Sequence, residues 1–413
     1  MENYNIYSDI AERTNGEIYI GVVGPVRTGK STFIKKIMDS LVIPNIESDY
    51  AKERTKDELP QSASGKTIMT TEPKFIPNEA VEVTIGDSAK MKVKMIDCVG
   101  YIVDGALGYI ENDAPRMVST PWNENPIEFK EAAQIGTKKV ICDHSTIGLV
   151  ITTDGSITDI ERQDYVPAEK QVIDELKAID KPFVVLLNTK YPDKPETESL
   201  RAFLEEEYKV PVICTDCANM TEQEINEIIK GVLYQFPIRE IGINMPSWID
   251  ALDEKHWLKS GMYDFILSAT DDIKRINDLK ILSEKAKEYE YIDCAEITEI
   301  ELGKGKAKID IKTPKSLFYK IANELSGFNV SNDAELLTIL TDMAVIKKEY
   351  EKVEGALLEV SRKGYGIVTP TIDELSLEEP EIVKQGNRFG VRLRASAPSI
   401  HMIRNKQRFL KTA

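Results

Sequence analysis

One short stretch near the start of the chain constrains the fold more than any other. Residues 24–31 read Gly-Pro-Val-Arg-Thr-Gly-Lys-Ser and fit the pattern GxxxxGK[ST]. A continuous apolar run at 18–23 precedes the stretch, and residues 32–41 follow it with apolar positions at helical spacing. A strand, a glycine-rich loop and a helix in this order predict a loop whose N–H groups surround phosphate oxygens. We therefore expect a P-loop nucleoside triphosphatase domain.

The loop residues have distinct expected roles. The glycines allow backbone angles that a Cβ would forbid. Lys30 is expected to reach the β- and γ-phosphates as a catalytic residue, and the Ser31 hydroxyl to bind Mg²⁺. The expected nucleotide-binding set from this segment is Gly24, Pro25, Val26, Arg27, Thr28, Gly29, Lys30, Ser31 and Thr32.

A carboxylate for the metal ion follows further along the chain. Residues 94–100 read Lys-Met-Ile-Asp-Cys-Val-Gly, which places Asp97 at the end of a predicted strand. The segment fits both a Walker B acid and the DxxG pattern of nucleotide switches. Asp97 is expected to hold Mg²⁺ through water as a catalytic residue, and Gly100 to place its N–H near the γ-phosphate. The alternative for Asp97 is an ordinary aspartate at a strand end.

A threonine-rich segment, 65–73, lies between these two motifs. Switch-type nucleotide hydrolases carry a threonine there that senses the γ-phosphate and completes the Mg²⁺ shell. Thr70 is the expected sensor and metal ligand, and the adjacent Thr71 is the other catalytic candidate. An exposed polar loop is the alternative.

The residues expected at the nucleotide base favour ATP over GTP. Guanine is read by the motif NKxD after a later strand, whereas this chain has Asn188, Thr189, Lys190 and Tyr191. Asn188 fits and is expected to contact the nucleotide, but the carboxylate that accepts from guanine is missing, and such a loss removes much discrimination. Asp193, two residues late, is the alternative acceptor.

Two further residues bear on hydrolysis. Tyr101 follows Gly100 at the position where small GTPases often carry a water-orienting glutamine, so hydrolysis is expected to be slow. Arg116 is a candidate arginine finger, and a surface arginine is the more common interpretation.

The order of predicted elements indicates the fold class. Strand-like runs at 18–23, 93–96, 147–152, 183–187 and 210–213 alternate with helical patterns near 168–179 and 222–234. This order predicts an α/β domain over 1–237 with a mostly parallel sheet and helices on both faces. We expect a middle α+β domain over 238–331, with a charged helix at 271–291 and strands at 297–311, and a C-terminal α+β domain over 332–413 with strands turning at 386–387.

One helical pattern in the last domain leaves two interpretations open. Apolar residues recur every three or four positions from Leu336 to Val360. The pattern is consistent with a coiled-coil seam used in assembly, or with a long amphipathic helix packed on its own domain, which is the more common outcome.

Composition limits the partners. The net charge is −16 and the sequence pI is about 4.9, so neither nucleic acid nor an anionic lipid surface is an expected default partner. Five unpatterned cysteines indicate reduced thiols, and the CxxC of Cys214 and Cys217 is expected to be core packing rather than a zinc site. The polar N-terminus and the lack of a long apolar run predict a cytoplasmic protein without a transmembrane segment.

Several stretches resemble one family, the stage IV sporulation protein A family of endospore-forming bacteria. They are GVVGPVRTGKSTFIKK (21–36), ELPQSASGKTIMTTEPKFIP (58–77), EAAQIGTKKVI (131–141), HSTIGLVITTDGSI (144–157) and RFGVRLRASAPSIHMIR (388–404). The resemblance implies a P-loop domain of the translation-factor-like GTPase class that uses ATP and Mg²⁺. It also implies Lys30 as the Walker A lysine, Asp97 as the Walker B acid and Thr70 as the sensor.

The resemblance further implies a self-assembling protein. Members of the family form a static homopolymer, the basement layer of the spore coat, on the mother-cell side of the outer forespore membrane. A small amphipathic membrane peptide anchors them, and they recruit other coat proteins. The resemblance also implies a continuation beyond the position of Arg404 to an apolar C-terminus that is linked to anchoring and assembly. This chain reads NKQRFLKTA there, and the two interpretations are a truncated or frame-shifted product and a natural variant.

The expected function is an ATPase that drives self-assembly. Two alternatives stay open: a switch-type GTPase that cycles with regulatory partners, and a scaffold that nucleotide stabilises without turnover.

Overall fold

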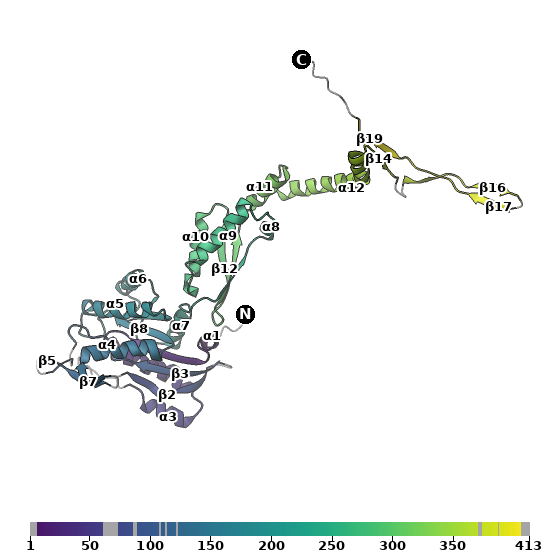
Figure 1. Ribbon diagram of the computed structural model, residues 1–413. Helices are drawn as coiled ribbons and strands as arrows, with labels where there is room; N and C mark the ends of the chain where they lie inside the picture. The colour runs from purple at the N-terminus through teal and green to yellow at the C-terminus, as the bar shows by residue number, and fades with distance from the viewer. Residues whose placement is uncertain are drawn as a thin grey trace, which may run out of the picture. The chain divides into compact units, whose positions relative to one another are not determined.

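A computed structural model describes residues 6–60, 73–85, 89–106, 109–111, 114–120, 123–370, 374–386 and 388–405 (Figure 1). The chain divides into two compact units, Met1–Thr313 and Pro314–Ala413. The predicted domain limits at 237 and 331 are not tested by this division and stay a prediction.

A six-stranded sheet forms the centre of the first unit, in the order β10-β9-β8-β1-β3-β2. The edge strand β2 (Lys74–Ile85) runs antiparallel to β3 and all other neighbours are parallel, so the predicted mostly parallel sheet is confirmed. The five parallel strands are β1 (Glu17–Val23), β3 (Ala89–Asp97), β8 (Ile147–Thr153), β9 (Phe183–Asn188) and β10 (Val212–Thr215).

Helices cover both faces of this sheet because its central strands are apolar on both sides. Every residue of β8 and β9 is buried. Core side chains on one face come from α4 (Phe129–Lys139), α5 (Arg162–Ala178) and α6 (Pro195–Tyr208). The other face packs against α1 (Ile6–Arg13), α2 (Lys30–Ile37) and α7 (Glu222–Leu233). A π-helical turn at Met38–Val42 and α3 (Asp49–Asp57) follow α2, and the short strands β4 (Ile110–Glu111), β5 (Ala114–Pro115), β6 (Met117–Thr120) and β7 (Asn123–Glu128) precede α4.

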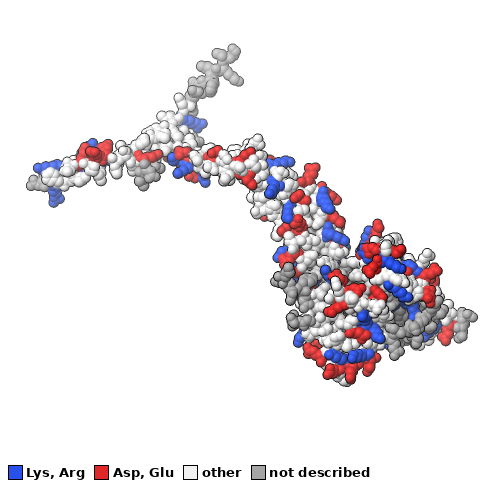
Figure 2. Space-filling model, turned by 180° about the vertical axis from the view of Figure 1, so that it is seen from behind, with Lys and Arg blue, Asp and Glu red and all other residues white. Residues whose placement is uncertain are grey.

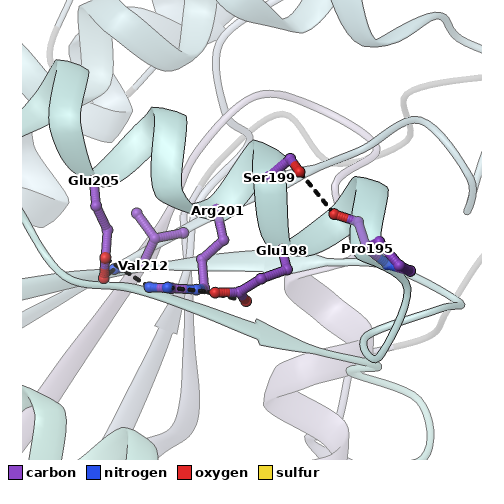
Figure 3. Close-up of polar contacts among 6 residues, drawn as sticks. All are labelled: Pro195, Glu198, Ser199, Arg201, Glu205 and Val212. Carbon is purple, nitrogen blue, oxygen red and sulfur yellow. Dashed lines mark hydrogen bonds and ion pairs between the residues drawn. The ribbon is translucent and has the colours of Figure 1, made fainter.

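Helix α6 also covers the end of the edge strand β10 (Figure 3). Arg201 donates to Glu198 at 2.6 and 2.9 Å and forms an ion pair with Glu205 at 2.6 Å. The other Glu205 oxygen accepts the N–H of Val212 at 3.0 Å. An edge-strand amide thereby has a side-chain partner in place of another strand.

The remainder of the first unit adds a three-stranded sheet in the order β11-β13-β12. Its strands are β11 (Glu240–Asn244), β12 (Cys294–Glu301) and β13 (Lys306–Lys312), and the helices α8 (Ser247–Asp250), α9 (Trp257–Thr270) and α10 (Lys280–Lys285) lie between β11 and β12 in the chain. The predicted strands at 297–311 are confirmed. The charged helix predicted over 271–291 is wrong in extent, because α10 occupies only six residues, flanked by single 3₁₀ turns.

Helix α1 attaches this second sheet to the first. The Arg13 guanidinium donates to the carbonyl oxygen of Leu302 at 2.6 Å, and the Gly303 N–H donates to Asp9 at 3.1 Å. Leu302 and Gly303 both lie at the turn between β12 and β13, so the chain's first helix holds that turn in place.

In the described part of the second unit, two helices are followed by paired strands. The helices are α11 (Lys315–Ser326) and α12 (Asp333–Lys363). The strands that follow form three antiparallel pairs. The pairs are β14 (Tyr365–Val368) with β19 (Ile400–Ile403), β15 (Ser376–Leu377) with β18 (Ala395–Ser396), and β16 (Glu381–Gln385) with β17 (Arg388–Arg392). The turn predicted at 386–387 follows β16, where Gly386 has φ 65°, and Asn387 lies outside the described residues.

Candidate functional site

The predicted phosphate-binding loop connects β1 to α2, as its sequence indicates. Gly24 has φ 138°, and a Cβ there would lie 2.2 Å from the carbonyl oxygen of Ile151. Gly29 has φ 93° and caps α2 without a side-chain hydrogen bond. The first-turn amides of α2 are therefore available to an anion, which the helix dipole also attracts.

Lys30 lies inside the loop rather than on its surface. Its ammonium group donates to the carbonyl oxygens of Pro25 at 2.7 Å and Gly24 at 3.4 Å, and the residue is 6% exposed. Burial lowers the pKa of Lys30, and the nearby Cys98 and Asp97 act in the opposite direction. A desolvated ammonium group held by loop carbonyls is a strong site for a polyphosphate.

Ser31 and Asp97 meet at the end of the sheet. The Ser31 hydroxyl donates to Oδ2 of Asp97 at 2.7 Å. The parallel register that pairs Val22 with Asp97 brings the last residue of β3 beside the start of the loop. Burial raises the pKa of Asp97, while the Ser31 bond and Lys30 lower it. A hydroxyl and a carboxylate oxygen at this spacing are the donor set that Mg²⁺ prefers next to a phosphate.

Gly100 brings the DxxG segment against the loop. A Cβ on Gly100 would lie 2.4 Å from the Gly24 oxygen and 2.5 Å from Nζ of Lys30. Two backbone bonds join the segments: the Tyr101 N–H donates to Gly24 at 3.2 Å, and the Val26 N–H donates to Tyr101 at 2.8 Å. Only glycine fits at position 100 because the two motifs approach this closely.

Two of the other loop residues have hydrogen-bond partners within the protein. The Thr28 hydroxyl donates to the Pro25 carbonyl at 3.0 Å, and Val26 is buried with its N–H bonded to Tyr101. Arg27 has φ 64°, the left-handed region that a side chain disfavours, and burial lowers its pKa. Thr32 is half-buried in the first turn of α2.

Asn188, predicted from its place after β9, contacts the loop directly. Its amide nitrogen donates to the Thr28 carbonyl at 2.9 Å, and its amide oxygen accepts the Cys217 N–H at 3.1 Å. A Cβ on Gly29 would lie 2.3 Å from that amide nitrogen. Asn188 therefore joins the loop to the segments that follow β9 and β10.

A hydrogen-bonded cluster around Asp154 was missed from the sequence. Thr189 is fully buried, and its hydroxyl donates to Asp154 at 2.6 Å. The Ser156 hydroxyl donates to the other Asp154 oxygen at 2.6 Å, and the Lys190 N–H donates to Ser156 at 3.1 Å. The cluster links the loops after β8 and β9. The only sequence signal was the Thr-Thr-Asp-Gly run at 152–155, directly after a buried strand.

The position where NKxD places its carboxylate is occupied by an aromatic ring. Tyr191 is 49% exposed, and Nζ of Lys194 lies 3.6 Å from the centroid of its ring. Asp193, the alternative acceptor, is exposed.

The residues considered for hydrolysis divide into three groups. Tyr101 is 1% exposed, and its hydroxyl donates to Glu175 of α5, so its side chain belongs to the core. Arg116 is half-buried, with its guanidinium over the ring of Phe129, 5.3 Å from the centroid. Thr70 and Thr71 lie outside the described residues.

Two family models together match almost the whole chain. The model of the stage IV sporulation protein A ATPase domain matches residues 1–237, and that of the middle domain matches residues 238–408. The chain belongs to the stage IV sporulation protein A family. The resemblance identified from the sequence is thus confirmed, and the loop described above lies in the family's ATPase domain.

Three relatives have the same family name. The chain is 52% identical over 402 residues to stage IV sporulation protein A of Clostridioides difficile (strain 630), covering 97% of this chain and 82% of the relative. It is 50% identical over 404 residues to that of Bacillus subtilis (strain 168), covering 98% and 82%. The protein from Bacillus anthracis is 48% identical over 404 residues, with the same coverage.

The described residues contain neither a membrane-spanning helix nor a cluster of metal-ligating side chains. None of their helices has the length and apolarity needed to cross a bilayer. Within the same part of the chain, no group of three or more histidine, cysteine or acidic residues is arranged to hold a metal ion.

Proposed function

We propose that this chain is an ATPase that binds Mg²⁺-ATP at residues 24–31 and hydrolyses ATP slowly. The observation that carries the proposal is the hydrogen bond between Ser31 and Asp97 beside the buried ammonium group of Lys30. A cation for the phosphates, a hydroxyl and carboxylate pair for the metal, and uncapped helix amides occur together here. We assign the domain to the translation-factor-like GTPase class of P-loop proteins.

The residues have complementary roles in this proposal. Lys30 exchanges its loop carbonyls for the β- and γ-phosphate oxygens. Gly100, whose Cα faces the Lys30 ammonium group, supplies its N–H to the γ-phosphate. Ser31 binds Mg²⁺ directly and Asp97 holds it through water, while Thr70 or Thr71 senses the γ-phosphate. When bound, Mg²⁺ neutralises charge that develops on the phosphate oxygens.

ATP rather than GTP is the proposed substrate. The exposed ring of Tyr191 replaces the carboxylate that reads guanine, and the hydroxyl of buried Thr189 is used to hold Asp154. Asn188 is bonded to backbone atoms on both sides, so it orders the loop. Turnover is slow because Tyr101 cannot orient water: its side chain is buried and bonded to Glu175.

We further propose that the nucleotide cycle is coupled to self-assembly. By family resemblance, the product is a static polymer in the basement layer of the spore coat, on the mother-cell side of the forespore. The partners would be further copies of this chain, a small amphipathic anchoring peptide and other coat proteins. The proposed division of labour follows the predicted domains, with nucleotide chemistry in 1–237, a middle domain in 238–331 and assembly and anchoring in 332–413.

The test is a turnover assay with ATP and GTP, read alongside sedimentation of the full chain. We expect phosphate release from ATP to exceed that from GTP, and pelleting to depend on nucleotide. Faster turnover of GTP would contradict the base assignment. Polymer that forms equally without nucleotide would favour a scaffold, and binding without turnover would favour a structural nucleotide.

A further inference from the structure

Helix α12 carries a long apolar stripe on its surface. Two sets of residues, each repeating every seven positions, lie three apart and so share one face of the helix. The first set, at positions a of a heptad, is Leu336, Met343, Tyr350 and Leu357. The second set, at positions d, is Ile339, Ile346, Val353 and Val360. We call these eight side chains the α12 stripe.

Four of the eight side chains of the α12 stripe are exposed in the single chain, and the other four are half-buried. Met343, Ile346, Tyr350 and Leu357 are 41–59% exposed. Ala356 is the buried residue among the 31 of α12, all of which are described. Strand β14 approaches the helix there, since a Cβ on Gly366 would lie 2.2 Å from the Ala356 oxygen. Most of the helix therefore lacks the tertiary packing that normally stabilises an amphipathic helix.

The repeat of the stripe indicates what covers it. A strict seven-residue repeat drifts around a straight helix and stays in one seam only when two helices supercoil around each other. The α12 sequence contains more acidic than basic residues, so an anionic lipid surface would repel it. In the view of Figure 2, acidic and basic side chains are interspersed along most of the described chain. A second copy supplies an identical stripe.

The charged residues beside the stripe distinguish the two orientations. Heptad positions e and g lie on the two sides of the a and d positions; Lys347 and Glu354 are at e, and Asp342 and Glu349 are at g. In a parallel pair, each g position faces the e position of the next heptad on the partner helix. Asp342 then faces Lys347, which is attractive, but Glu349 faces Glu354, which is repulsive. In an antiparallel pair, e faces e and g faces g. With Tyr350 opposite Val353 of the second copy, Lys347 then faces Glu354 and Asp342 faces Lys363. The antiparallel arrangement has two attractive contacts, each occurring twice, and no like-charge contact.

We propose that the α12 stripe is a dimer interface, in which α12 pairs antiparallel with α12 of a second copy of this chain. The interface deepens the proposed function, because it assigns one of the contacts that self-assembly needs. It lies in the second compact unit and the nucleotide site lies in the first, so each can be tested without the other.

The test compares two neighbouring substitutions in the full chain. Ile346→Glu places a carboxylate in the stripe, and Val345→Glu places the same group one position away, at an almost equally exposed apolar residue (59% and 60%). Molar mass is measured by sedimentation velocity over a range of concentrations without nucleotide. We expect a concentration-dependent dimer for the unsubstituted chain and for Val345→Glu, and at least about tenfold weaker dimerisation for Ile346→Glu.

Two outcomes would overturn the interface: an unsubstituted chain that stays monomeric, or equal effects of the two substitutions. ATP binding is measured on the same samples, so a failure of the nucleotide proposal is recorded separately. Orientation is tested by disulfide formation in a Cys142→Ser background. Mixing Tyr350→Cys with Val353→Cys protein should give a cross-linked dimer, whereas cross-linking of Tyr350→Cys with itself would show a parallel pair.

Discussion

Ser31 and Asp97 are joined by a 2.7 Å hydrogen bond, although one begins a helix and the other ends a strand. The bond crosses the point where β3 and the loop after β1 come together, and Lys30 is buried beside it. Two groups of opposite charge, Lys30 and Asp97, are thus buried side by side, which is the arrangement that the proposed metal–nucleotide site requires.

Asp97→Asn should keep or raise the stability of the folded protein while it weakens the contribution of Mg²⁺ to ATP binding. Burial raises the pKa of Asp97, so the folded state binds its proton more tightly than the unfolded state, and the ionised carboxylate costs stability at neutral pH. The cost fades as pH falls through the raised pKa. We expect the Asp97→Asn variant without nucleotide to melt at the same or a higher temperature at pH 7, with a smaller gain at lower pH.

The same substitution should weaken the effect of Mg²⁺ on ATP affinity by about 10- to 100-fold, since a group that orients bound water is lost. Calorimetric titration with and without Mg²⁺ measures this change. If Asp97→Asn left the Mg²⁺ dependence intact, Asp97 would be an ordinary strand-end residue.

Lys30→Ala should remove nucleotide binding without unfolding the domain. The ammonium group is desolvated in the free protein, and its charged contacts with phosphate are worth on the order of 3 kcal/mol, or more than 100-fold in affinity. Lys35→Ala, at an exposed position of the same helix, is the matched control. Equal affinities of the two variants for a fluorescent ATP analogue would exclude the assigned loop role.

Thr70→Ala should keep ATP binding and lower turnover by about tenfold or more, because the γ-phosphate sensor acts mainly in the transition state. Thr71→Ala is the neighbouring comparison, and the variant with the larger loss of turnover identifies the sensor. Single-turnover phosphate release together with direct binding makes the distinction. Loss of binding in both variants to the same degree would argue against a sensor.

Tyr101→Gln should destabilise the protein and leave turnover no faster. The ring is packed in the core and its hydroxyl is bonded to Glu175, so the substitution removes packing and a hydrogen bond worth about 2–4 kcal/mol together. Tyr191→Gln, at a half-exposed ring, should change stability little. Denaturant unfolding and phosphate release measure the two effects. Faster hydrolysis by the Tyr101→Gln variant would show that the side chain at this position can reach the nucleotide.

The parts of the candidate site that were predicted from the sequence are those that form short, continuous motifs in the chain. The loop, Lys30, Ser31 and the Asp97–Gly100 segment follow from motifs that a strand precedes. The antiparallel edge strand β2 was not predicted, and the charged stretch at 271–291 was taken for one helix because charge and spacing alone do not show where a helix stops.

Sequence alone determined the phosphate loop, the alternation of strands and helices, and the heptads of α12, because each is a local pattern of glycine, charge or apolar spacing. Tertiary structure decided that Asn188 bonds to Thr28 and that Tyr101 turns into the core. These relationships depend on which strands become neighbours in the sheet, and the hydrogen bonds that set strand order join residues that no sequence period connects.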